Sequence, residues 1–127
     1  MRELKFRVWS EEDREYRTDL NVFRLHGGKI MCTSPMYNLD GDGFDVEQYT
    51  GLKDKNGEPI YEGDIVKYAW TRCNYIVAYR KYDASFVLEN DDREEIICFQ
   101  YNRKSDYEVI GTIHENPELL EEVKGER

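Results

Sequence analysis

The sequence predicts a mainly β protein, in which a compact antiparallel barrel-like sheet, SH3-like in part, carries an N-terminal β extension and a short C-terminal helix. Aromatic residues make up 13% of the chain and ten residues are tyrosines, a composition that favours strands over helices. Short apolar runs recur at intervals of about ten residues, as in antiparallel sandwiches and barrels. Turns rich in glycine, asparagine and aspartate separate these runs.

The N-terminal third of the chain predicts three strands and two loops. The first strand alternates apolar with basic side chains and ends at Trp9. The Gly27–Gly28 pair between the second and third strands allows a tight hairpin turn. The strands are expected at residues 4–9, 22–25 and 30–32, with a solvated loop or an excursion between strands at 10–19 and an exposed loop at 33–45.

Turn residues, strand patterns and aromatic residues occur together most densely between Gln48 and Val66. A strand over residues 46–50 leads to Asn56–Gly57, the dipeptide of a two-residue type I′ turn, in which both central residues have positive φ. Gly63–Asp64 predicts a second turn, where the carboxylate bonds the turn's own amides and a buried strand over 65–69 begins. Small SH3-like barrels often start a strand in this way.

The C-terminal half predicts a meander of strands followed by a helix. Gly111 permits a bulge or a close backbone approach in the last strand. The period then changes, because Asn116 is a suitable N-cap and Pro117 a suitable first residue for a helix over 116–123. The strands are expected at residues 75–79, 85–88, 95–99 and 107–113.

Length and charge limit the organisation and location of the chain. Its 127 residues fit one domain over 1–127, with a possible N-terminal subdomain over 1–45 and a barrel-like core over 46–127. The net charge of −9 at pH 7 favours basic partners or solubility and disfavours nucleic acid and anionic lipid. Three scattered cysteines, with neither a membrane span nor a signal peptide, predict a cytoplasmic protein that does not bind membranes.

Three segments resemble the YopX-like family of phage and prophage proteins. They are KFRVW at 5–9, the stretch at 48–66 with TGLKDKNG and IYEGDIV, and VIGTIHENPELL at 109–120. The resemblance implies a compact, β-rich, phage-derived protein of the bacterial host cytoplasm, and it implies no activity, cofactor or catalytic residue. The sequence departs from the family pattern, which usually has Asp, Asn and an aromatic residue at these three positions, at Ser10, Thr112 and His114.

Several sets of residues are candidates for catalysis or metal binding. Paired aspartates can share a proton or a cation, but aspartate beside glycine is ordinary turn chemistry, and no EF-hand register follows. Two histidines are too few for a common zinc site, and a buried cysteine on a strand is usually inert. The sequence therefore predicts no catalytic residue, no metal and no cofactor, and a non-enzymatic protein. The candidate catalytic or metal-binding residues considered are Asp40 with Asp42, Asp54 with Asp64, His26, and Cys98 with His114.

Interaction is the predicted function, with a protein partner or with a second copy of the chain. Candidate binding residues are those of the dense stretch to which turns and core assign no role, together with the first tryptophan: Trp9, Gln48, Thr50, Asp54, Tyr61 and Glu62. One alternative is a barrel that binds single-stranded nucleic acid through interleaved aromatic and basic residues, which are Trp70, Arg72, Tyr75, Tyr79, Arg80, Lys81 and Tyr82. Another is an acidic mimic of DNA that inhibits a host protein, through residues 11–13, 89–95 and 118–122.

Overall fold

The computed structural model of the chain describes residues 5–17, 22–24, 30–33, 36–38, 43–81, 84–90, 96–99 and 104–120. It divides into two compact units, Met1–Tyr49 and Thr50–Arg127. The division lies a few residues after the subdomain boundary expected at residue 45, and the single-domain organisation stays a prediction. The turn at residues 26–29, Asp40 and Asp42 lie outside the described residues.

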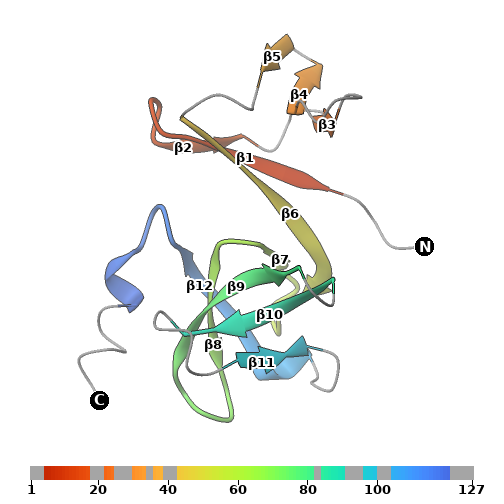
Figure 1. Cartoon of the computed structure of the whole chain (residues 1–127). Coiled ribbons are helices and arrows are strands. Elements are labelled where there is room, and N and C mark those ends of the chain that lie inside the picture. Colours follow the sequence, from red (N-terminus) through yellow and green to blue (C-terminus); the bar gives the residue numbers. More distant parts are fainter. Residues whose placement is uncertain are drawn as a thin grey trace. The chain divides into compact units, whose positions relative to one another are not determined.

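Unit 1 is built around a central first strand. Its strands are β1 (Phe6–Ser10), β2 (Glu15–Arg17) and the first part of β6 (Phe44–Lys53), with a small second sheet of β3 (Val22–Arg24), β4 (Ile30–Thr33) and β5 (Met36–Asn38). β1 pairs antiparallel with both β2 and β6, and Figure 1 shows this order. A buried ion pair of 2.9 Å joins Arg7 Nε to Glu47 Oε1 across β1 and β6.

Two loop predictions for unit 1 are corrected by these strands. The loop expected at 10–19 contains β2, because Arg14 N donates to Ser10 O at 2.8 Å and so turns the chain back onto β1. The loop expected at 33–45 contains β5, and β6 begins at Phe44. In both cases a strand of three residues pairs with a longer neighbour, and a run this short gives no clear alternation in the sequence.

Unit 2 is a curled antiparallel sheet that forms half of a barrel (Figure 1). The strand order is β11-β10-β9-β8-β12, and β7 lies beside β6. This arrangement confirms the mainly β, barrel-like class. The strands are β7 (Pro59–Tyr61), β8 (Asp64–Tyr68), β9 (Asn74–Arg80), β10 (Ser85–Glu89), β11 (Ile96–Cys98) and β12 (Tyr107–Thr112), with a 3-10 turn over Lys104–Asp106.

The core of unit 2 is formed by alternate residues of these strands, because successive side chains of a strand point to opposite faces. Tyrosines supply much of it: the rings of Tyr68 and Tyr107 stack with centroids 5.7 Å apart, and Phe99 packs against Tyr107 at 4.8 Å. The buried cluster consists of Ile60, Val66, Tyr68, Tyr75, Val77, Leu88, Phe99 and Tyr107.

The turn between β6 and β7 differs from the predicted type. Within it only Gly57 has positive φ, at 82°, so the two-residue type I′ prediction is wrong. Gly57 N donates to Asp54 O at 3.0 Å, and Asp54 N donates to Glu58 O at 2.9 Å. This is a three-residue loop, in which a type I turn is followed by a left-handed glycine. The Asp54 carboxylate stabilises it by accepting from the backbone N–H groups of Asn56 and Glu58, each at 2.9 Å.

The last strand and the helix start follow the sequence more closely. The register of β12 shifts between Val109 and Gly111, which confirms the predicted bulge. Residues 118–120 are helical, and the predicted remainder to residue 123 lies outside the described part of the chain. The prediction that the Asn116 side chain caps this helix is wrong, since Asn116 Oδ1 accepts from Thr112 N at 3.3 Å instead. No helix in the described ranges has the length and apolar character that a membrane crossing needs.

Candidate functional site

The candidate binding residues of unit 1 are Trp9 and Gln48. The Trp9 side chain is 1% exposed, and its Nε1 donates to Glu11 Oε1 at 2.9 Å. Its ring meets that of Tyr16 edge-on at 4.9 Å, while the Arg14 guanidinium lies 5.2 Å from the ring centroid. Gln48 is half-buried on β6, opposite Phe6. Trp9 thus holds the β1–β2 hairpin together.

The candidate residues of unit 2 are Thr50, Asp54, Tyr61 and Glu62. Thr50 Oγ1 donates to Ile60 O at 2.8 Å, while Asp54 is fully buried and also accepts from Val109 N at 2.9 Å. Tyr61 is buried and Glu62 is half-buried. These contacts give most of the set a structural use, and its binding role stays a prediction.

The second predicted turn forms as expected. Asp64 is buried, and its Oδ2 accepts from Tyr61 N at 2.8 Å, which confirms that this carboxylate bonds a turn amide. Asp54 and Asp64, considered above as a cation or proton pair, therefore each engage backbone N–H groups. His26 and the side chain of Cys98 lie outside what the structure describes.

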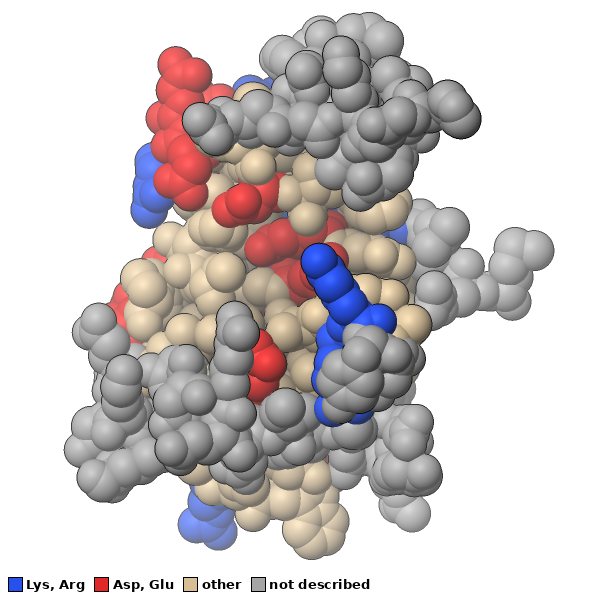
Figure 2. All heavy atoms as spheres, viewed as in Figure 1, with Lys and Arg blue, Asp and Glu red and all other residues tan. Residues whose placement is uncertain are grey.

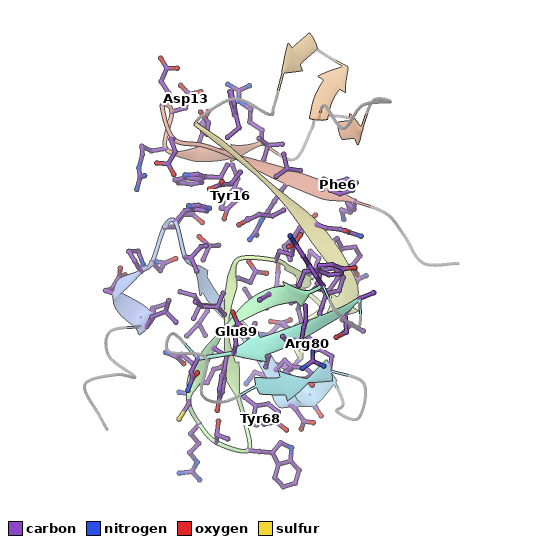
Figure 3. All side chains as sticks on the ribbon, in the orientation of Figure 1. Phe6, Asp13, Tyr16, Tyr68, Arg80 and Glu89 are labelled. Atoms are coloured by element: carbon purple, nitrogen blue, oxygen red, sulfur yellow. The ribbon has the colours of Figure 1, made fainter. Side chains whose placement is uncertain are left out.

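The interleaved aromatic and basic residues do not form one surface. Trp70 is 76% exposed, whereas Tyr75 is completely buried in the core. Trp70 and Arg72 precede the seven-residue β9, while Tyr79 and Lys81 lie at its other end, roughly 20 Å away at the usual rise of a strand. In Figure 3 the labelled Tyr68 marks the first of these ends and Arg80 the second. Tyr82 is not among the described residues.

At the turn between β1 and β2, the acidic residues that suggested a mimic of DNA are interspersed with basic ones. Glu11 Oε2 accepts from Arg14 Nη1 at 2.9 Å, and Asp13 Oδ2 accepts from Arg17 Nη2 at 3.4 Å. Figure 2 shows acidic and basic side chains together at this turn. Such exposed pairs are typical of a solvated surface.

The turn between β8 and β9 presents the most exposed large apolar side chain described, that of Trp70. The turn is closed by Tyr68 N donating to Cys73 O at 3.0 Å and by Arg72 N donating to Tyr68 O at 2.8 Å. Arg72 has a φ of 60°, a left-handed conformation that is uncommon outside glycine. Because backbone atoms make these bonds, the turn does not depend on the indole for its shape.

A hollow of about 350 Å³ adjoins this turn. Its lining includes Lys67 of β8 and Glu108 of β12, which lie opposite each other in the register of the two strands. Ala69 N donates to Asp106 O at 2.9 Å, which fixes the turn to the start of β12. We call this feature the charged hollow, and it is lined by Lys55, Lys67, Ala69, Arg72, Ser105, Asp106, Tyr107 and Glu108.

The charged hollow contains three basic and two acidic side chains, in a protein whose net charge is −9. Lys55 Nζ lies 3.6 Å from Glu108 Oε1. Burial, and then the charge of Asp106, raise the pKa of the Tyr68 phenol above its usual value.

Sequence reasoning missed this site, because its residues come from three distant segments of the chain. The closeness of Trp70 and Arg72 in the sequence was the one available signal.

Comparison with known proteins gives a family and a fold. The model of the family described as YopX protein matches residues 5–121. The crystal structure of protein EF1440 from Enterococcus faecalis is 31% identical, covers 94% of this chain and 99% of its own, and has a TM-score of 0.61. The crystal structure of yopX from Bacillus subtilis is 18% identical over 94% of this chain and 98% of its own, also with a TM-score of 0.61, a likeness of fold. No curated protein matches the chain.

Proposed function

We propose that this chain, which belongs to the YopX family, is a non-enzymatic, phage- or prophage-derived interaction protein that binds a protein partner or a second copy of itself. The contact face is the turn between β8 and β9 together with the charged hollow. One observation carries the proposal: Trp70 stands 76% exposed on a turn whose backbone bonds do not require it.

The exposed indole of Trp70 offers a large, rigid apolar surface that a partner can cover. Tryptophan and arginine are the residues most enriched among those that dominate binding energy at protein interfaces. Trp70 and Arg72 lie two positions apart on one turn, and the charged hollow beside them supplies a polar rim. An apolar anchor surrounded by polar groups is the usual composition of a protein-binding surface.

A non-catalytic role fits the use that the structure makes of its carboxylates. Asp54 and Asp64 are buried and accept from backbone N–H groups, so that their structural task competes with acid–base chemistry. The Cys73 thiol is free, which suits the reducing bacterial cytoplasm that we propose as its location.

The test is affinity capture from a bacterial lysate with the full chain and two variants. Trp70→Ala removes the anchor, and Leu52→Ala is the matched control, because Leu52 is also a large exposed apolar residue of unit 2. We expect proteins captured by the wild type and by the control to be lost with Trp70→Ala. Sedimentation tests self-association in the same way, since a dimer that uses this face should dissociate in Trp70→Ala. Identical captured proteins and identical mass for all three would overturn the proposal.

A further inference from the structure

We infer that the charged hollow binds an acidic side chain of the partner, an aspartate or glutamate, while Trp70 contacts an apolar residue beside it. The inference rests on the proposed function and specifies the chemistry of the partner. The ligand class is thus an acidic, partly apolar peptide segment, recognised through Lys67, Arg72 and Trp70.

The charges that remain available in the charged hollow are positive. Glu108 Oε1 forms an ion pair with Lys55 Nζ at 3.6 Å, and Glu108 also lies opposite Lys67 in the strand register. Asp106 already interacts with other groups, and its negative charge acts on Tyr68. By contrast, neither Lys67 nor Arg72 makes an ion pair with any residue that the structure describes. An incoming carboxylate would meet two cations that make no ion pair with the described residues.

The fold fixes the backbone positions from which these two cations project. Lys67 is exposed on β8, where alternation places Val66 and Tyr68 in the core. Arg72 is held by its backbone bond to Tyr68 O at 2.8 Å, and Trp70 lies between Lys67 and Arg72 in the chain. The ligand therefore meets a turn whose backbone is already formed, which lowers the entropy cost of binding.

The size of the charged hollow limits what can enter it. About 350 Å³ is near the lower end of the range for small-molecule pockets, so one or two side chains can fill it. Trp70, standing outside on the turn, then contacts residues that follow or precede the inserted one. A short linear segment or a protruding loop satisfies both requirements.

The same charges disfavour a nucleic acid as ligand. A polynucleotide carries a phosphate at every step, and affinity for it rests on many cations. Asp106 and Glu108 line the charged hollow together with the basic residues, so that neighbouring phosphates would meet carboxylates. The net charge of −9 repels every anion, and this repulsion grows with the charge of the ligand, so that it opposes a polynucleotide more than a single carboxylate. A single carboxylate needs only the two cations that make no ion pair.

The experiment is selection from a displayed library of random peptides on the full chain, followed by binding measurements with the enriched peptides. We expect enrichment of aspartate or glutamate close to an apolar or aromatic residue. Lys67→Glu and Arg72→Glu should each weaken binding at least about tenfold, because each places a like charge against the ligand. Raising the salt concentration from about 50 mM to about 500 mM should weaken wild-type binding as well.

Lys81→Glu is the matched control, since it makes the same change in net charge on an exposed lysine at the far end of β9 and should leave peptide affinity unchanged. Enriched peptides without acidic residues, or equal affinity for Arg72→Glu, would overturn the inference. So would binding of an oligothymidylate that depends on Arg72, because it would assign the site to single strands. In the lysate capture, loss with Trp70→Ala but not with the charge reversals leaves the proposed function standing and removes only this inference; loss with neither removes both.

Discussion

Two turns of unit 2 border the same hollow and use their side chains in opposite ways. The turn between β6 and β7 contains Asp54, a fully buried carboxylate that accepts three backbone N–H groups, from Asn56, Glu58 and Val109. The turn between β8 and β9 contains Trp70, a 76% exposed indole on a backbone that bonds to itself. A buried side chain that accepts the turn's hydrogen bonds contributes to stability. An exposed apolar side chain that makes no bond in its turn is instead available to bind a partner.

The largest expected effect tests the first half of this comparison. Asp54→Ala leaves three partly buried hydrogen bonds without their acceptor, one of them to β12, and a buried N–H group without a partner costs about 1–3 kcal/mol. We expect a loss of about 3–5 kcal/mol in the free energy of unfolding, measured with urea. Glu58→Ala removes an exposed carboxylate from the same turn and should change stability by no more than about 0.5 kcal/mol. Equal effects of the two substitutions would remove the distinction between the turns.

A smaller loss of stability is expected at Gly111, where a third turn approaches closely. A Cβ added there would lie 2.6 Å from Asn116 Oδ1 and 2.8 Å from Asn116 Cβ. Since the second contact is with an atom that cannot rotate away, Gly111→Ala should destabilise the protein by about 1–3 kcal/mol. In a background with Asn116→Gly the same substitution should cost much less, because both contacts vanish. A cost that is unchanged in that background would place the strain elsewhere.

Sequence reasoning succeeded where one residue determines a local geometry and failed where partners come from far along the chain. Gly111 predicted its bulge, and Asp64 predicted its amide bond, since both depend on neighbouring backbone. Asn56–Gly57 gave the position of the hairpin but the wrong turn type, because the carboxylate of Asp54 selects a three-residue loop. That carboxylate also reaches Val109, which no local pattern indicates.

The candidate site shows the same limit. The stretch at 48–66 is predicted to contain binding residues because it is rich in Asp, Tyr and Glu. Three of those candidates, Thr50, Asp54 and Tyr61, are buried. In the sequence Trp70 is one of several aromatic residues, and alternation alone does not reveal that Tyr75 is buried while Trp70 is exposed. Exposure is decided by which strand faces cover one another, and that information lies in the register of β8, β9 and β12.

For the turn between β8 and β9, we expect the loss of the Trp70 side chain to have almost no effect on stability. Trp70→Ala removes an exposed indole, so the free energy of unfolding should change by no more than about 0.5 kcal/mol in urea titrations. The same variant should lose the captured partner, which separates a binding role from a folding role. A loss of more than about 2 kcal/mol would show that the indole packs against the fold and would contradict the role proposed for it.

The smallest expected effect concerns Tyr68, which leads from the core into the second turn. Burial, and then the charge of Asp106, raise the pKa of its phenol in the folded state above the unfolded value of about 10. The folded protein therefore favours the neutral phenol: its contribution is fully present below about pH 10 and is lost as the pH rises through the folded pKa. Between about pH 9 and about pH 11, stability should fall less steeply in Tyr68→Phe than in the wild type, because the phenol no longer titrates. Asp106→Asn removes the second cause and should give a smaller change in the same direction, whereas equal slopes for Tyr68→Phe and the wild type would show that the phenol ionises alike in both states.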